Sequence, residues 1–319
     1  MRSDAAVLRH LTGRLDGAAP FYLATCAVVC IDLEWWQEEP HSTTEVGISE
    51  LTPLSTAFPL PHAANHLENV RVGHVRIKEH AHLLNKFDGA GNPNNFEFGR
   101  SKFVALDDAK RLIHETLNRR NVAGQYQPII LIMHDHKSKL VHLKDVMGLG
   151  TSLMRNVVKI IDTQDLTLQE KLPIAYQGTG AAQKPKAIRL ADLVGWFNLP
   201  TDNLHTAGND AGYTLIAAIL LAQKEQPPVT TSMQRPRAVI HGVNIIDVLQ
   251  HVQNRNRFYT HFPWGSVIFC TKCDSPQHMR KNCFVQVNCK HCSASADLSR
   301  RIWAHTHKTE KCVFSPLKQ

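Results

Sequence analysis

Residues 22–36 read YLATCAVVCIDLEWW, and this stretch decides the fold class. It is a long run of β-branched and other apolar residues, which is typical of a central strand buried on both faces of a sheet. Asp32 and Glu34 interrupt the run two residues apart, so on a strand both carboxylates point to the same face. A pair of this kind fits a strand end that faces solvent, or a site in which a cation or basic side chains neutralise the carboxylates.

The elements that follow indicate a mixed sheet with helices packed on it. Alternating or continuous apolar patterns predict further strands at 43–51, 69–80, 127–135 and 156–164. Amphipathic or apolar patterns predict helices at 105–120, from 137 onward, at 186–197 and at 208–222, with a linker at 223–231.

Positive charge and cysteine are both concentrated near the end of the chain. The formal net charge is +8, and residues 229–319 hold 13 Lys and Arg against 4 Asp and Glu, so the remainder is close to neutral. Six of the eight Cys lie between Cys270 and Cys312. A neutral domain with a basic appendage favours a polyanionic partner, although a solvated tail has the same composition.

The first four ligand-type residues of this region have the spacing of a zinc knuckle. They are Cys270, Cys273, His278 and Cys283, in the pattern C-x2-C-x4-H-x4-C. Close Cys pairs with a nearby His and Cys complete a tetrahedral zinc site within a short loop. Such knuckles resemble modules that bind single-stranded nucleic acid, and Phe284 offers them a stacking face or packs the module.

A second set of ligand-type residues follows. Cys289, Cys292 and Cys312 are candidates for another zinc ion, and the fourth ligand is His307 or His305. The alternative is a single zinc ion with spare cysteines.

A late segment, LHTAGNDAGYTL at 204–215, carries His205 and Asp210 five residues apart. The spacing places the His on a loop and the Asp in the first turn of a helix. An Asp at a helix start is ordinary, so this pair gains meaning only together with the first strand.

Together these segments resemble the motifs of DEDDh 3′–5′ exonucleases. The motifs are Asp32-x-Glu34, the TEVG segment at 44–47 and His205-x4-Asp210. Flanking segments fit as well, namely VRIKEHAHLLNKF (75–87), NFEFGRSKFV (95–104) and IIDTQDL (160–166). Over about residues 22–222 the chain is similar to the fungal ribonuclease-H-like family that includes the QDE-interacting exonuclease and the Gfd-type proteins.

The resemblance implies a chemistry and a set of roles. Members of the family hold two divalent cations, Mg²⁺ or Mn²⁺, which stabilise the attacking and leaving oxygens at a terminal phosphodiester. Carried over, Asp32, Glu34 and Asp210 are the metal ligands and His205 is the general base. The resemblance assigns no catalytic role to the TEVG segment.

The middle motif departs from the family pattern. Members usually carry Gly-His-Asn-x-x-x-Asp-Leu, whereas residues 133–140 read MHDHKSKL, which puts Lys139 at the usual metal-ligand Asp. An ammonium in place of a carboxylate repels a cation. Either Lys139 takes the place of one metal and leaves a pseudo-enzyme, or Asp135 substitutes from one helical turn earlier, or a register shift uses Asp145.

The sequence therefore predicts a ribonuclease-H-like α/β domain at 21–225, after an extension at 1–20 and before a basic connector at 226–265 and a zinc-binding region at 266–319. Two functions stay open. One is a metal-dependent 3′–5′ exonuclease on RNA or DNA. The other is a catalytically degenerate nuclease fold that binds RNA or single-stranded DNA, or bridges a protein partner through the zinc region.

Two features bear on the location of the protein. No apolar run is as long as the roughly 18 residues of a membrane span. The N-terminal segment MRSDAAVLRHLTGRLDG lacks the apolar stretch of a secretory signal. We therefore expect no membrane partner and a place inside the cell, in the nucleus or the cytoplasm.

Overall fold

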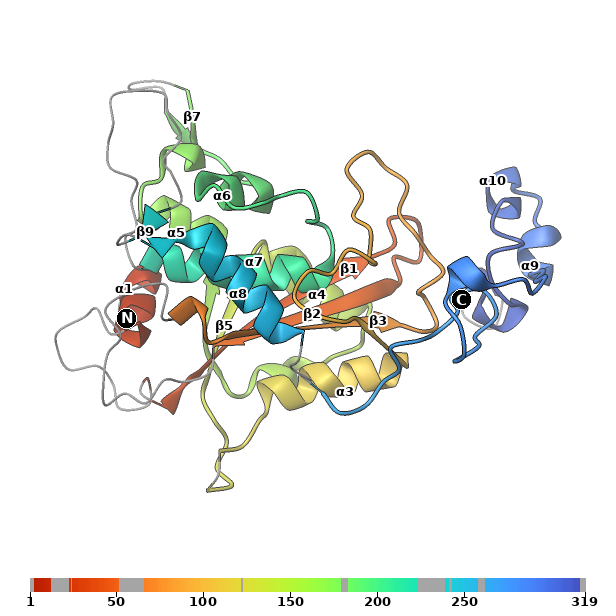
Figure 1. The fold of residues 1–319 in the computed structure, drawn as a ribbon, viewed down its shortest axis with the longest axis horizontal. Coiled ribbons are helices and arrows are strands. Elements are labelled where there is room, and N and C mark those ends of the chain that lie inside the picture. The colour runs from red at the N-terminus through yellow and green to blue at the C-terminus, as the bar shows by residue number, and fades with distance from the viewer. Residues whose placement is uncertain are drawn as a thin grey trace.

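A six-stranded mixed sheet lies at the centre of the computed structural model (Figure 1). The model describes residues 3–12, 23, 25–51, 66–121, 123–178, 183–222, 239–240, 243–257 and 262–315. The strands are β1 (Ala27–Trp35), β2 (Thr43–Leu51), β3 (Val70–Ile77), β4 (Lys102–Val104), β5 (Ile129–Met133) and β6 (Val157–Asp162).

The strand order is β4-β3-β2-β1-β5-β6. β1, β2 and β3 pair antiparallel, whereas β5 pairs parallel to β1 and β6 parallel to β5. This order, with helices on both faces, confirms the predicted ribonuclease-H-like mixed α/β fold.

Helices cover both faces of the sheet, with α3 on one side and α7 and α8 on the other (Figure 1). They are α1 (Asp4–Leu11), α3 (Leu106–Leu117), α4 (His136–Asp145), α5 (Thr163–Gln169), α6 (Leu190–Trp196), α7 (Ala207–Ala222) and α8 (Ile245–Asn256). Val28 and Cys30 of β1 belong to the core that contains α7, whereas Val29 and Ile31 belong to the core that contains α3. β1 is therefore buried on both faces, as its apolar composition predicts.

The strand and helix boundaries differ from the expectation in a few places. β4 is only three residues long, too short for a periodic pattern to show in the sequence. α5 begins directly after β6, with the Asp162 side chain accepting a hydrogen bond from the backbone N–H of Gln164 as an N-cap.

Helix α8 lies within the range 226–265, which we expected to be a connector. The first part of that range, residues 226–238, lies outside the described residues, and so does the linker predicted at 223–231. The buried Asn256 ends the helix and binds the free edge of β3. Its side-chain oxygen accepts from Val72 N at 2.8 Å, and its amide nitrogen donates to Val70 O at 3.0 Å. The described end of the expected connector is thus part of the folded domain.

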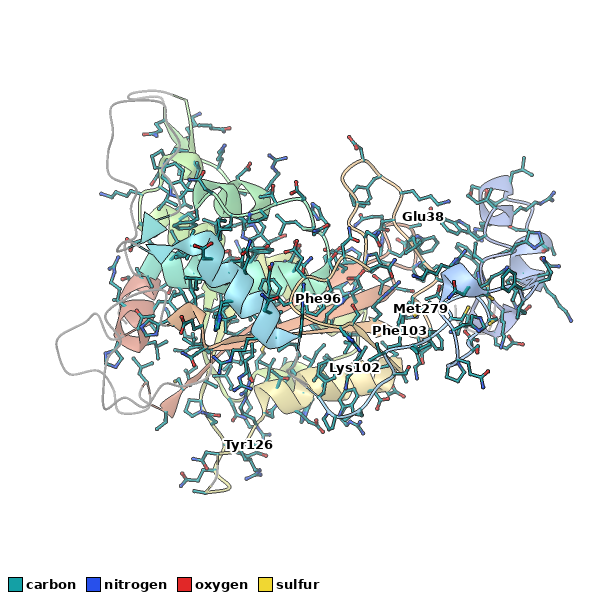
Figure 2. All side chains as sticks on the ribbon, in the orientation of Figure 1. Glu38, Phe96, Lys102, Phe103, Tyr126 and Met279 are labelled. Carbon is teal, nitrogen blue, oxygen red and sulfur yellow. The ribbon has the colours of Figure 1, made fainter. Side chains whose placement is uncertain are left out.

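The Cys-rich region is docked against the sheet. Ser266 exchanges two backbone hydrogen bonds with Phe103 of β4, at 2.7 and 3.0 Å. Phe103 also packs against Phe269 and Met279, and Figure 2 shows Phe103 and Met279 side by side at this junction. The region therefore continues from the edge of the sheet, at the right of Figure 1, with two short helices, α9 (Lys290–Ser293) and α10 (Leu298–Arg301).

Among the described helices, none combines the length and the apolar character needed to span a bilayer.

Candidate functional site

The site is built where β1 ends and α7 begins. Asp32 and Glu34 continue the alternation of Val28 and Cys30, so they lie on the face of β1 that α7 covers. α7 contacts β1, β2 and β3. Its start comes so close to β2 that a Cβ atom on Gly47 would lie 1.8 Å from the Ala207 carbonyl oxygen. Glycine in the TEVG segment therefore permits the approach that brings α7 to the acidic strand.

Three of the predicted site residues meet at this point. Ligand atoms of Glu34, His205 and Asp210 all lie within 4.8 Å of one another. His205 adopts a left-handed backbone with φ of 61°, and its backbone N–H donates to Asp210 Oδ1 at 3.0 Å. The exposed His205 side chain thus lies beside the partly buried Glu34 and the buried Asp210.

Lys139 occupies the other side of the same site. Its Nζ lies 2.9 Å from Asp32 Oδ1, with the two side chains 12% and 4% exposed, and it also donates to the His134 carbonyl. Burial alone would lower the pKa of Lys139, but the Asp32 carboxylate raises it above its ordinary value. Lys139 therefore stays positively charged and is fixed on one of the predicted metal ligands.

The two substitute carboxylates that the sequence left open do not join this group. Asp135 precedes α4 with a left-handed φ of 58° and accepts a hydrogen bond from Ser138 Oγ at 2.7 Å. Asp145 is exposed at the far end of α4, 3.9 Å from Lys144. In the structure, Lys139 lies within the acidic site, whereas Asp135 and Asp145 lie outside it.

His134, at the His position of the middle motif, has a packing role. It is buried, its Nε2 contacts the Ile188 carbonyl at 3.0 Å, and its Nδ1 contacts Thr163 Oγ1 at 2.7 Å. Burial lowers the pKa of His134 to about 4. A neutral imidazole in this position ties β5 to α5.

The remaining acids of the site repel one another. Burial, followed by the charges of Asp210 and Asp32, raises the pKa of Glu34 well above its ordinary value. Burial and the Asp32 charge likewise raise the pKa of Asp210. The arrangement is that of a group which a divalent cation would stabilise.

Glu45, which the motif match left without a catalytic role, is a further member of this acidic group. It pairs with Glu34 across β1 and β2, and its Oε2 accepts from His74 Nε2 at 2.9 Å and from Ala207 N at 3.2 Å. Glu45 therefore holds the first turn of α7 in place. Its position two residues before Gly47 is the only signal, because its contact with Ala207 spans 162 residues of sequence.

The Cys-rich region contains two separate four-ligand clusters. The first joins Cys270, Cys273, His278 and Cys283, and the second joins Cys289, Cys292, His307 and Cys312, each with ligand atoms within 4.8 Å of one another. Such sets of three thiols and one imidazole could hold zinc in a tetrahedron. His305 is exposed and contacts the Val287 carbonyl through Nδ1 at 3.1 Å, so the geometry selects His307 for the second cluster.

The second cluster lies against the strand that carries the acidic site. Trp36, which follows β1, packs edge-on to Trp303 at 6.1 Å and to Phe314 at 5.7 Å. These rings share one apolar core with Cys289, Cys292 and Cys312. The acidic site and the second Cys cluster are therefore joined through the end of β1.

A ribonuclease-H-like sheet with acids on its first strand and a His-x4-Asp segment entering a late helix defines a nuclease-type domain. A family model described as "DNA polymerase III subunit epsilon-like, C-terminal domain" matches residues 27–221, which is more than half of the chain. The chain belongs to this DEDDh exonuclease-like family.

The other comparisons are sparse. No curated protein matches the chain. Among solved structures, the chain is similar to the zinc-bound form of an E. coli ExoI–ssDNA complex, with 12% identity and a TM-score of 0.35. That match covers 63% of this chain and 41% of the other, so the chain spans about two fifths of the ExoI chain's length.

Proposed function

We propose that the protein binds single-stranded nucleic acid with the help of its Cys-rich region, and that Lys139 disables the two-metal site of its DEDDh-type domain. The observation that carries the proposal is the buried contact of 2.9 Å between Lys139 Nζ and Asp32 Oδ1. At a separation of 4 Å and an effective dielectric constant of about 20, like unit charges repel by about 4 kcal/mol. A divalent cation beside Asp32 carries two charges, so the Lys139 ammonium would repel it about twice as strongly.

The Cys-rich region supplies the second part of the proposal. We assign one zinc ion to each four-ligand cluster and take the first to be a zinc knuckle. Phe284 follows the last ligand of that knuckle and is 94% exposed, and Lys281, three residues earlier, is exposed as well. An exposed ring suits stacking of an unpaired base, and an exposed ammonium on the same module suits contact with a phosphate.

The position of the chain within the family is also part of this proposal. The motifs support a place near the fungal QDE-interacting and Gfd-type proteins, with the nuclease-type domain at about 21–225 and the zinc region at 266–319. RNA and single-stranded DNA share the chemistry that this surface would contact, so both are substrates for the test.

Binding is tested by fluorescence anisotropy with labelled RNA and single-stranded DNA oligonucleotides. We expect affinity that falls as salt rises, because phosphate contacts release counterions. Phe284→Ala should weaken binding by about 5- to 150-fold, since stacking on one aromatic ring contributes about 1–3 kcal/mol per base. Val285→Ala, at the next exposed apolar residue, is the matched control and should bind as the wild type does.

Turnover is tested on the same oligonucleotides carrying a label that reports loss of the 3′ end, in the presence of Mg²⁺ or Mn²⁺. The wild type should leave them intact, and Lys139→Asp should shorten them. Shortening by the wild type that disappears in Asp32→Ala would overturn the disabled site.

That outcome would establish the second candidate function, a metal-dependent 3′–5′ exonuclease. The observation in its favour is the convergence of Glu34, His205 and Asp210 within 4.8 Å. Glu34 and Asp210 would hold a cation that polarises the phosphodiester. His205 would then accept the proton of the attacking water.

A further inference from the structure

We infer that the acidic site takes one divalent cation, held by Glu34, His205 and Asp210, and that the Lys139 ammonium supplies the second positive charge. The inference rests on the proposed nuclease-type site and names the ions it accepts. It concerns a feature of this chain, because it depends on the lysine at position 139.

The geometry of the three ligands suits a single ion. Their ligand atoms lie within 4.8 Å of one another. Oxygen ligands about 2.1 Å from a small divalent cation lie about 4.2 Å apart when they are opposite each other. One cation therefore fits between these side chains, with modest closure of the ligands around it.

The hydrogen-bond pattern separates these ligands from Asp32. Asp32 is bound to Lys139 at 2.9 Å, whereas the Glu34 carboxylate has no hydrogen-bond or ion-pair partner among the residues that the structure describes. Glu34 is partly buried and lies between the charges of Asp210 and Asp32. A carboxylic group in this position is stabilised either by a proton or by a cation bound beside it.

With one divalent ion, the charges of Asp32, Glu34, Asp210 and Lys139 balance, and Glu45 is held separately. Asp32, Glu34 and Asp210 contribute three negative charges, and Lys139 neutralises one. Glu45, the fourth acid, is already bound to His74 at 2.9 Å and to the backbone of α7. One divalent cation neutralises the remainder, whereas a second would have to enter beside an ammonium.

The arrangement also links the number of cations to the proposed function. An imidazole that ligates a cation has no free nitrogen on that side to accept a proton from water. His205 as a ligand would thus be lost as a general base. The cation and Lys139 together then form a two-point contact for the phosphate of a bound nucleic acid.

The test counts Mn²⁺ ions by electron paramagnetic resonance of free Mn²⁺ in a titration of the full-length, zinc-loaded chain without nucleic acid. The wild type should bind one more Mn²⁺ per chain than Glu34→Gln, and His205→Ala should bind it more weakly. Lys139→Asp should bind two. Asp145→Asn, at an exposed carboxylate on the same helix as Lys139, is the matched control and should bind as the wild type does.

Several results would overturn the inference. They are two Mn²⁺ in the wild type, no difference between the wild type and Glu34→Gln, unchanged affinity in His205→Ala, or a single Mn²⁺ in Lys139→Asp. Should Lys139→Asp fail to fold, Lys139→Gln removes the charge without adding a carboxylate. That variant must gain a second, weaker Mn²⁺ for the inference to stand.

Failure of this inference can be distinguished from failure of the proposed function. If the protein binds the oligonucleotide in Mn²⁺-free buffer but the titration finds no Mn²⁺ at this site, only the inference is overturned. One bound Mn²⁺ with no oligonucleotide affinity overturns only the proposed function.

Discussion

The Glu34 carboxylate links the chemistry of the site to the stability of the fold. Burial and neighbouring acids raise its pKa well above the value of 4.5 for an unperturbed Glu. For an acid whose pKa is higher in the folded state, the folded protein binds the proton more tightly than the unfolded chain does. This contribution to stability is fully present below pH 4.5 and is lost as the pH rises through the raised pKa.

Replacing Glu34 by Gln, which does not ionise, should remove this loss of stability at high pH. Without added divalent cations, Glu34→Gln should melt a few degrees above the wild type at pH 8, given about 2–4 °C for each kcal/mol in a domain of this size. The difference should shrink as the pH falls toward 4.5, where the folded protein keeps Glu34 protonated and the unfolded chain is half protonated. The measurement is the melting temperature from pH 4.5 to 8. Glu38→Gln, at an exposed acid, is the control, and a constant difference across this range would contradict the explanation.

At the scale of elements, the site depends on how closely α7 lies against β2. A Cβ atom on Gly47 would meet the backbone of Ala207, which cannot rotate away as a side chain could. Glu45 holds the same backbone through its hydrogen bond of 3.2 Å to Ala207 N. The position of Asp210 relative to β1 therefore depends on two residues of β2.

Gly47→Ala should displace the start of α7. Overpacking in a core typically costs about 1–3 kcal/mol, and a contact with backbone lies at the upper end. We expect a loss of about 3 kcal/mol in the free energy of unfolding, measured by urea denaturation, together with weaker Mn²⁺ binding. Gly150→Ala, where an added Cβ meets nothing within 4 Å, is the matched control. Equal effects of the two substitutions would refute the role given to the close approach.

Helix α8 packs on the core through its apolar face, and the Asn256 side chain at its end takes the place of a strand neighbour beside β3. Asn256→Ala leaves Val72 N and Val70 O without the partners that they have at 2.8 and 3.0 Å. A buried polar group without a partner costs about 1–3 kcal/mol, so a loss of roughly 2–4 kcal/mol is expected. Urea denaturation measures it, and hydrogen exchange at Val72 should accelerate. Asn254→Ala, exposed on the same helix, should change neither quantity.

At the scale of the whole molecule, the Cys-rich region and the sheet form one packed unit. The second cluster shares its apolar core with Trp36 and Leu83 of the nuclease-type domain. Lys311 of this region also donates a hydrogen bond of 2.6 Å to the Lys78 carbonyl. Folding of the region, which the metal would drive, is thereby coupled to the end of β1.

We therefore expect two zinc ions per chain, and loss of the second should destabilise the nuclease-type domain. Cys312→Ser should lower the zinc content by one and lower the melting temperature of the whole chain, because Trp36 loses its cover. Elemental analysis and thermal melting measure the two effects. Cys26→Ala, at a buried Cys outside both clusters, should keep both zinc ions. Loss of zinc with an unchanged melting temperature would show that the region is not coupled to the sheet.

Much of the architecture could be predicted because its signals are local. The apolar run at 22–36 and the alternation at 69–80 indicate β1 and β3, since strand burial repeats every two residues. The Cys and His spacings indicate the two clusters, because a tetrahedral site within a short loop constrains spacing. The shared face of Asp32 and Glu34 follows from the same two-residue repeat. The sequence patterns did not predict β4 because it is short, and they did not predict α8 because its packing depends on a distant strand.

The class of fold is predictable from the sequence, which also shows the acids of the first strand, the His-x4-Asp segment and the lysine at position 139. Only the folded chain shows that Lys139 binds Asp32, that Asp135 and Asp145 lie outside the acidic group, and that Glu45 binds the first turn of α7. The physical reason is distance along the chain. Periodicity and spacing report on neighbours within a few residues, whereas these contacts join side chains that only the packing of α4 and α7 on the sheet brings together.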